Sequence, residues 1–355
     1  MKIAFLHMTM GLTDRGSEAV VDMLASALAK KHDVMVIQSG KIAKKRYTAK
    51  RIAPLEVAPI PAPRNLLDKF LFRLHVDQES GHVATFTIAA LPILKKFAPD
   101  VIVAINGPLQ LRILNDQHMS VKIVVFGHAG IGYHDRDTLR ACPDLFIALT
   151  PRAEAWAKQS AEALTKVVYI PNPIDTTQYA NMPPAALTLD KPIVLTVAAL
   201  SAYKNVLPTI QAVRQTICSY LLIGDGEQSE AVAREFSTFS NSFLWVKHVE
   251  MANIPGYYQT ADVFCFTPDR QESFGMVYLE AMAVGLPIVA SDDGVRRDLI
   301  GKQGIYVNPH NPTEIANGIA RALKLGKLDY TNELVAYKLD TVVQKIENEL
   351  HALIN

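Results

Sequence analysis

The chain has 355 residues, of which 49% are hydrophobic and 20% charged, and its formal net charge is +1. This length is enough for two domains that each bury a core, and the composition excludes a disordered protein. No stretch reaches the roughly 18 apolar residues of a membrane-spanning helix. We expect no nucleic-acid partner.

The first residues, MKIAFLHMTMGLTDRG, do not have the form of a signal peptide, because a short apolar run leads straight into charged residues. Cys142, Cys218 and Cys265 lie far apart in or beside apolar runs, without metal-ligand spacing. We therefore expect core thiols in a reducing compartment, no metal site and a cytoplasmic protein.

The first half of the chain alternates buried strands with helices. The sequence predicts a strand over Lys2–Met8, a helix over Ser17–Lys31 and a strand over His32–Ile37. Such an alternation with apolar strands is typical of a parallel, doubly wound α/β sheet. Further predicted strands and helices follow in chain order: a helix over Leu66–Leu74, a helix over His82–Phe97, strands over Asp100–Ile105, Val121–Phe126 and Asp144–Leu149, a helix starting at Thr150-Pro151, and a strand over Val167–Ile170.

The second half repeats this alternation after a polar, proline-bearing stretch between Asp175 and Pro192, which is the best linker candidate. Predicted strands cover Pro192–Val197, Tyr220–Ile223, Phe243–Val246, Val263–Phe266 and Ile288–Ala290. Predicted helices cover Lys204–Ile217, Ala231–Phe239 and Glu333–Ile354, the last of them long and amphipathic.

The most informative stretch is TPDRQESFGMVYLEAMAVGLPIVAS, which runs from Thr267 to Ser291 and carries Glu272 and Glu280. The turn Ser273-Phe274-Gly275 opens an apolar helix that Gly285 and Pro287 should end. A strand, a glycine-containing turn and a helix make a place where backbone N–H groups and the helix dipole can hold phosphate.

Glu280 is the only charged residue from Met276 to Val284. A carboxylate on a helix packed between buried strands should meet a donor, such as a ribose hydroxyl pair or a basic side chain. The alternative is that Glu280 lies on the one solvated face of the helix.

The loop Gly11–Glu18 is neither a P-loop, because Ser17 stands where lysine is required, nor a dinucleotide-binding G-x-G-x-x-G. It still suits an anion at a helix N-terminus, and Glu18 is expected to be a first-turn carboxylate favoured by the dipole. His128 follows a predicted strand and should point into the ligand crevice at the carboxyl ends of the strands. It would either hydrogen-bond a substrate or be a satisfied structural histidine.

The stretch with Glu272 and Glu280 resembles the E-x7-E motif of the retaining GT-B glycosyltransferases called family 4. The resemblance implies two Rossmann-like domains facing a central cleft: an acceptor-side domain over 1–175, a nucleotide-sugar-binding domain over 186–330, and a helix over 331–355 that crosses back to the first domain. It implies that backbone N–H groups at Ser273, Phe274 and Gly275 hold the donor diphosphate, that Glu272 approaches the donor sugar, and that Glu280 takes the ribose hydroxyls.

Other segments are similar to the same family. Gly16-Ser17-Glu18 keeps part of a G-G-x-E loop, with Arg15 in place of its first glycine, which makes Gly16 a candidate for the donor phosphates. The resemblance also implies that His128 lies near the sugar and the acceptor. Further similar segments are Ile170–Asp175, in which Pro173 replaces a glycine, and Ile254–Tyr258.

The chain departs from the family at Ala199, where an arginine normally neutralises the diphosphate together with a lysine. The lysine is present as Lys204. A lysine at a helix start is unfavourable for the dipole, which favours a bound anion there. Arg296, Arg297 or Arg15 could replace the missing arginine from another loop.

The resemblance implies a metal-independent retaining glycosyltransferase with no cofactor, which uses a nucleotide-diphosphate sugar, with UDP or GDP expected, and a glycan, lipid-linked or small-molecule acceptor. A role in cell-envelope polysaccharide synthesis would fit. The alternatives are a sugar-nucleotide-binding subunit with weak or no catalysis, and another GT-B enzyme such as a sugar-nucleotide epimerase. The basic segment Lys41–Arg51 is either a solvated loop or a peripheral contact with an anionic membrane at its inner face.

Overall fold

The computed structural model describes residues 1–13, 16–43, 45–52, 68, 70–71, 74, 77–162, 164–239 and 242–355. The helix expected over Leu66–Leu74 falls largely outside the described residues, and Arg15 and Lys44 lie outside them. The chain divides into two compact units, one comprising Met1–Pro173 with Leu339–Asn355, the other Ile174–Lys338.

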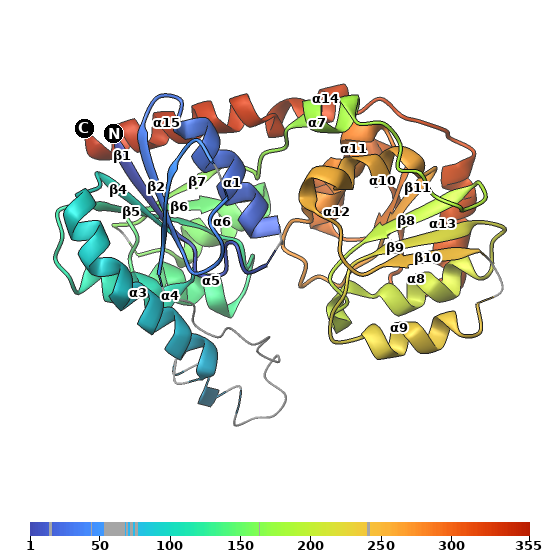
Figure 1. The fold of residues 1–355 in the computed structure, drawn as a ribbon, viewed down its shortest axis with the longest axis horizontal. Coiled ribbons are helices and arrows are strands. Elements are labelled where there is room, and N and C mark those ends of the chain that lie inside the picture. The colour runs from blue at the N-terminus through green and yellow to red at the C-terminus, as the bar shows by residue number, and fades with distance from the viewer. Residues whose placement is uncertain are drawn as a thin grey trace. The chain divides into compact units, whose positions relative to one another are not determined.

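The first unit is built on a seven-stranded sheet in the order β3-β2-β1-β4-β5-β6-β7 (Figure 1). The pairings of its described strands are all parallel. The strands are β1 (Lys2–Leu6), β2 (Asp33–Gln38), β3 (Thr48–Arg51), β4 (Val101–Ala104), β5 (Lys122–Phe126), β6 (Leu145–Ala148) and β7 (Lys166–Tyr169). The four residues of β4 and of β6 are all buried, as expected of strands covered on both faces.

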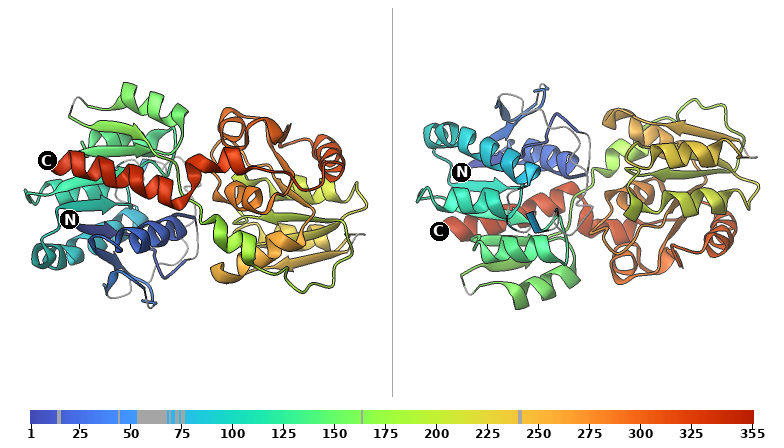
Figure 2. Two further views of the ribbon diagram at one scale, coloured as in Figure 1. Left: turned by 90° about the horizontal axis from the view of Figure 1, so that it is seen from above. Right: turned by 90° about the horizontal axis from the view of Figure 1, so that it is seen from below.

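Helices cover both faces of this sheet (Figure 2). On one face α1 (Gly16–Leu28) packs against the C-terminal α15 (Leu339–Ile354), and on the other α3 (Gln78–Phe97) packs against α4 (Pro108–Asn115). The remaining helices of the unit are α5 (Tyr133–Arg140) and α6 (Pro151–Ser160). Glu347 of α15 accepts hydrogen bonds from Lys31 and His32, at 2.8 and 3.1 Å, and thereby ties this helix to the end of α1.

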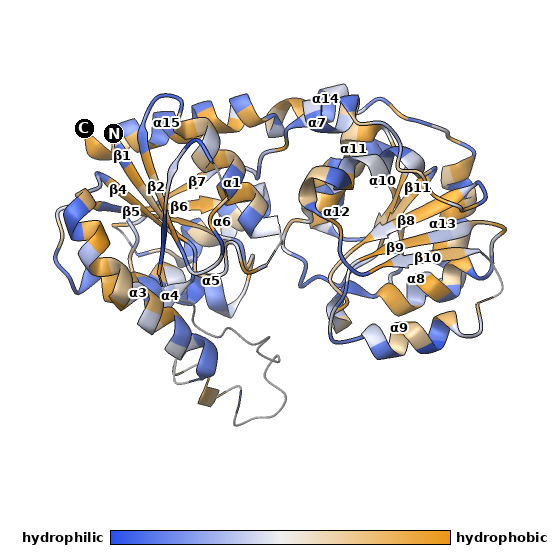
Figure 3. Cartoon of the chain, in the orientation of Figure 1, coloured by the Kyte–Doolittle hydropathy of each residue, from blue (hydrophilic) through white to orange (hydrophobic). Residues whose placement is uncertain are grey.

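The second unit contains a six-stranded parallel sheet in the order β10-β9-β8-β11-β12-β13. Its strands are β8 (Ile193–Val197), β9 (Ser219–Ile223), β10 (Phe243–Val246), β11 (Val263–Phe266), β12 (Ile288–Ser291) and β13 (Ile305–Val307). Figure 3 shows hydrophobic residues gathered on the central strands of each sheet. The doubly wound α/β architecture predicted from the sequence is confirmed.

The helices of the second unit also lie on two faces. One group packs around α8 and comprises α8 (Val206–Val213), α9 (Ser229–Phe236) and α13 (Pro312–Leu323). A second group packs around α11 and comprises α7 (Thr176–Asn181), α10 (Ile254–Thr260), α11 (Met276–Val284), α12 (Gly294–Ile300) and α14 (Thr331–Leu334). Short 3-10 turns are η1 (Ala202–Lys204), η2 (Met251–Asn253), η3 (Gly301–Gln303) and η4 (Val335–Tyr337).

Three local predictions differ from the structure. The helix expected over Glu333–Ile354 is broken, because η4 ends at Tyr337, Lys338 is not helical, and the Tyr337 carbonyl accepts the Ile174 N–H at 2.8 Å. The stretch expected to be a linker contains α7, which belongs to the second unit. The predicted helix over Lys204–Ile217 begins as η1 and continues as α8 only after Asn205, whose φ is +51°.

The basic segment Lys41–Arg51 is not a plain loop, because its end forms the edge strand β3. Lysine on an edge strand discourages pairing with other chains, so part of this basic character has a structural explanation. Among the described residues, no helix is both long and apolar enough to span a bilayer.

Candidate active site

The sequence-predicted residues Lys204 and Glu272 follow β8 and β11, two neighbouring strands at the centre of the second sheet. The strand order reverses between these two strands. Ligands of open α/β sheets bind at such a switch point, outside the carboxyl ends of the strands. Lys204 ends η1 directly after β8, and Glu272 lies in the loop between β11 and α11.

Lys204 and Glu272 form an ion pair across this switch point, although they lie 68 residues apart in sequence. Their side chains are only 16% and 12% exposed, so solvent screens the pair poorly. The Lys204 ammonium also lies 4.8 Å from the centroid of the Tyr203 ring. The cation predicted for the phosphates and the carboxylate predicted for the sugar are therefore already in contact.

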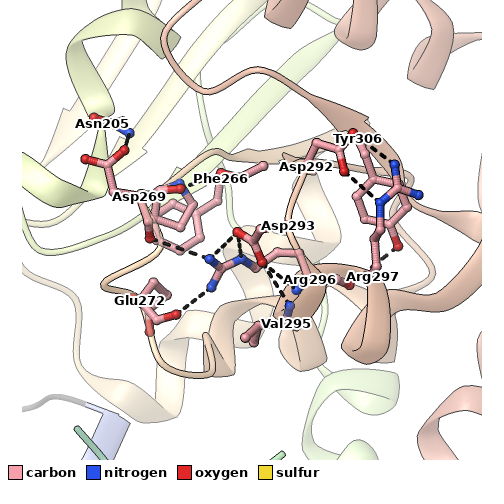
Figure 4. A network of polar contacts seen from close by, with 12 residues as sticks. Asn205, Phe266, Asp269, Glu272, Asp292, Asp293, Val295, Arg296, Arg297 and Tyr306 are labelled. Atoms are coloured by element: carbon pink, nitrogen blue, oxygen red, sulfur yellow. Dashed lines mark hydrogen bonds and ion pairs between the residues drawn. The ribbon is translucent and has the colours of Figure 1, made fainter. Parts of the chain in front are cut away.

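The loop that carries Glu272 is held by Arg296, as Figure 4 shows. The Arg296 guanidinium donates to the Glu272 carbonyl at 2.6 Å and to the Asp269 carbonyl at 3.5 Å. It is fully buried and paired with Asp293, whose carboxylate also caps the N-terminus of α12.

Ala199 stands where an arginine is expected, and it is exposed. The contacts of Arg296 and Arg297 show whether either of them could supply the missing charge. Arg296 does not present its charge to solvent, and its donors are directed at Asp293 and at the loop backbone. Arg297 is paired with Asp292, at 2.6 and 2.9 Å, and its guanidinium lies 4.5 Å from the Tyr306 ring centroid. Of Lys204, Arg296 and Arg297, Lys204 is therefore the one whose charge lies at the switch point.

The N-terminus of α11 has the geometry predicted for a phosphate site. Gly275 precedes the helix with φ of +89°, and no side chain caps it. A Cβ on Gly275 would lie 2.7 Å from the Tyr278 ring, so only glycine fits. Phe274 is 3% exposed and Ser273 is half-buried, so the turn can offer its backbone and the first-turn N–H groups to an anion.

Two tyrosines lie near Glu280, and they were not predicted from the sequence. Glu280 is half-buried, and the hydroxyls of Tyr258, on α10, and Tyr179, on α7, lie near its carboxylate. Burial raises the pKa of Glu280, and the two hydroxyls oppose this rise. Two hydroxyls that could serve as the donor expected for this carboxylate therefore lie near it within the second unit.

A cavity of about 580 Å³ lies at the carboxyl ends of β11, β12 and β13, beside the Glu272 loop. It is large enough for a small ligand. Its lining includes Asp269, Ser291, Asp293, His310 and Glu314. Carboxylates outnumber cations in this lining, so the cavity suits a neutral hydroxyl-bearing ligand better than a phosphate.

In the first unit, His128 follows β5 and its ring stacks on Phe126, with centroids 5.7 Å apart. Burial lowers the pKa of His128 to about 4, with a smaller contribution from His7. At neutral pH the ring is therefore uncharged and acts as a hydrogen-bonding group. Gly16 is the exposed first residue of α1, and residues 14 and 15 before it lie outside the described part of the chain.

Glu18 is the centre of a buried network that the sequence analysis missed. It is 5% exposed and accepts hydrogen bonds from Thr9 at 2.7 Å, Thr13 at 2.6 Å and Ser17 at 2.8 Å. These donors and His7 lower the pKa of Glu18, although burial alone would raise it. The sequence does contain these hydroxyl residues close together, at Thr9, Thr13 and Ser17, but only the folded turn brings them to the Glu18 carboxylate. No metal-binding cluster of His, Cys, Asp and Glu occurs among the residues described.

Comparison with known proteins shows what this chain is similar to. Residues 180–337 match the family model described as glycosyl transferases group 1. A phosphatidyl-myo-inositol mannosyltransferase from Mycolicibacterium smegmatis is 29% identical over 232 residues, which cover 62% of this chain and 56% of that protein. The first three curated relatives are matched over 56%, 43% and 15% of their lengths, so the chain spans about half of them or less.

Solved structures match nearly the whole chain. Sucrose-phosphate synthase from Thermosynechococcus elongatus has a TM-score of 0.80 at 19% identity and covers 99% of this chain and 98% of its own. The Anabaena protein HepE in complex with UDP-glucose has a TM-score of 0.72 at 20% identity, with 99% and 100% covered. These neighbours and the two parallel-sheet units define a GT-B fold. The match to the group 1 glycosyl transferases covers less than half of the chain and lies within its second unit, which is similar to that family.

Proposed function

We propose that this chain is a retaining glycosyltransferase that moves a sugar from a nucleotide-diphosphate sugar to an acceptor hydroxyl. The observation that carries the proposal is the pairing of Lys204 with Glu272 at the switch point of the second sheet, in the loops that flank an uncapped helix N-terminus. This combination supplies a cation and backbone N–H groups for a diphosphate, and a carboxylate for sugar hydroxyls.

In the proposed complex, Lys204 leaves Glu272 for the diphosphate, and the N–H groups of Ser273 to Gly275 hold the same group. Glu272 then accepts hydrogen bonds from the sugar, and Glu280 from the ribose. The HepE complexes with UDP and UDP-glucose support a UDP-linked donor, with GDP as the alternative. No cofactor is required.

The proposed reaction forms a bond between the acceptor oxygen and the anomeric carbon, and breaks the bond from that carbon to the diphosphate. The departing phosphate takes the proton of the acceptor hydroxyl. His128, uncharged at neutral pH, hydrogen-bonds the sugar or the acceptor. Because Ala199 supplies no second cation, leaving-group stabilisation depends on Lys204 and the backbone donors.

The acceptor is proposed to be a glycan, a lipid-linked sugar or a small polyol. Relatives whose names include phosphatidyl-myo-inositol, diacylglycerol and D-inositol 3-phosphate support this range. Lys41 and Lys50 are exposed, whereas Lys45 is paired with Asp22 at 2.7 Å. A peripheral contact of Lys41–Arg51 with anionic lipid is part of the proposal.

The second candidate is a sugar-nucleotide-binding subunit with little catalysis. Ala199 favours it, since neither Arg296 nor Arg297 presents a spare charge.

The test is turnover of UDP-glucose and GDP-mannose with mixed monosaccharide, inositol and lipid acceptors. The anomeric configuration of the product would be read by proton NMR. We expect turnover with retained configuration. It should be lost in Lys204→Met and Glu272→Gln and kept in Glu230→Gln, a control at an exposed position on α9. Nucleotide binding without turnover would favour the binding subunit, and a product of inverted configuration would contradict the retaining mechanism.

A further inference from the structure

Arg296 is the largest fully buried side chain of the described chain and the only cation among those large buried groups. It lies in α12, outside the motif that carries Glu272 and Glu280. A buried guanidinium is costly unless its donors are satisfied, so the groups it contacts show what it does.

The partners of Arg296 fall into two sets. On one side its Nε donates to Asp293 at 2.8 Å, and a terminal nitrogen completes a two-point ion pair with the same carboxylate. On the other side its terminal nitrogens reach the carbonyls of Glu272, at 2.6 Å, and Asp269, at 3.5 Å. Figure 4 shows the guanidinium between Asp293 and this loop.

Asp293 is itself fixed, because its other oxygen accepts the N–H groups of Val295 and Arg296 as the N-cap of α12. The loop is fixed at a second point, where Asp269 accepts from Asn205, the residue after Lys204, at 2.9 Å. The backbone of Glu272 is thus connected to α12 by a planar, charged group that cannot rotate freely.

We propose that Arg296 and Asp293 are positioning residues that set where the Glu272 carboxylate meets the donor sugar. Neither touches the diphosphate. This inference rests on the proposed function, because it assigns to Glu272 the sugar of a nucleotide sugar. It adds that recognition of the sugar, as distinct from the nucleotide, depends on a buried pair on the next helix.

A positioning role changes the contribution of the sugar to binding but not the affinity for UDP, whereas loss of the fold would change both. Loosening the loop should weaken the contribution of the sugar and slow turnover. Of the proposed diphosphate donors only the Ser273 N–H shares a peptide with the carbonyl that Arg296 holds, so Lys204 and the first turn of α11 should stay in place. The ratio of the dissociation constants for UDP-glucose and UDP measures the sugar contribution. The dissociation constant for UDP alone measures the rest.

The experiment is calorimetry of UDP and UDP-glucose, with turnover of UDP-glucose, on the full chain and three variants. Asp293→Asn keeps a good N-cap but removes the charge that holds Arg296. Arg296→Lys keeps the charge but not the two-sided geometry. Arg297→Met is the matched control, because it removes a neighbouring but exposed pair.

We expect Asp293→Asn and Arg296→Lys to raise the ratio of the UDP-glucose to UDP dissociation constants about tenfold and to lower kcat at least as much. UDP binding should stay within about threefold, and Arg297→Met should behave as the unchanged protein. An unchanged ratio and kcat in both folded variants would overturn the inference. Equal losses for UDP and UDP-glucose would also overturn it, since they indicate a purely structural role. If the unchanged protein binds neither ligand, the proposed function itself fails, and this outcome is distinct from both.

Discussion

One prediction follows from the Lys204–Glu272 ion pair and would not follow from the proposed contacts with the nucleotide sugar alone. If a diphosphate must draw Lys204 away from Glu272, replacing Glu272 by glutamine should strengthen the binding of UDP. The same replacement should weaken the contribution of the sugar, because Glu272 is proposed to accept its hydroxyls. Loss of a binding residue would then improve affinity for one ligand.

The size of the gain follows from the burial of the pair. Exposed ion pairs contribute about 0.2–1 kcal/mol, and breaking a fully buried pair costs about 3–5 kcal/mol. Side chains that are 16% and 12% exposed lie between these limits. We take about 1–2 kcal/mol, which corresponds to a gain of about 5- to 30-fold in UDP affinity.

The assay is calorimetry of UDP with the unchanged protein, Glu272→Gln, Lys204→Met and the double variant. Lys204→Met should weaken UDP binding, and most of the gain from Glu272→Gln should vanish in that background, because it acts through Lys204. Glu230→Gln is the control. Weaker UDP binding in Glu272→Gln would refute the reasoning, as would a gain of equal size in both backgrounds.

Four further predictions concern other residues. Arg296→Met should lower the free energy of unfolding by about 3–5 kcal/mol in urea titrations, because it strands Asp293 and two loop carbonyls; Arg297→Met should cause no detectable change, and equal effects would contradict the buried-pair account. The pKa of His128 is about 4 in the folded protein and about 6.5 when unfolded, so the unfolded state binds the extra proton between these values. Stability should therefore fall by about 2–3 kcal/mol from pH 6.5 to 4, and a titration in His128→Asn of the same steepness would rule this out. Glu280→Gln should weaken UDP about tenfold but leave 2′-deoxy-UDP nearly unaffected, whereas equal losses would remove the ribose assignment. Ala199→Arg should raise kcat about 10²-fold by restoring a cation for the leaving group, and an unchanged kcat would show that the backbone donors suffice.

Much of the fold could be predicted because the strands are short, continuous apolar runs. The predicted bounds of Phe243–Val246 and Val263–Phe266 are those of β10 and β11. The helix Met276–Val284 was bounded correctly, because Gly275 and Gly285 both adopt positive φ at its ends. The C-terminal helix was not, since the chain leaves helical geometry at Lys338, where the second unit ends, and amphipathic periodicity alone carries no sign of that break.

The candidate site was predictable where residue type and local spacing determine it. Lys204 and Glu272 were selected from their motifs, and the parallel topology brings them together. The tyrosines at Glu280 and the buried role of Arg296 were missed for a common reason. A basic residue in a seven-residue helix is usually a surface residue, and only the tertiary fold brings the Glu272 carbonyl to it.

The central claim is that the second unit binds a nucleoside diphosphate through Lys204, the N-terminus of α11 and Glu280. Calorimetry of UDP, GDP and ADP against the unchanged protein and Glu280→Ala tests it most directly. The account predicts micromolar binding of one of the three nucleotides, UDP or GDP, and its loss in Glu280→Ala. Absence of binding by all three, or equal binding by both proteins, would contradict it.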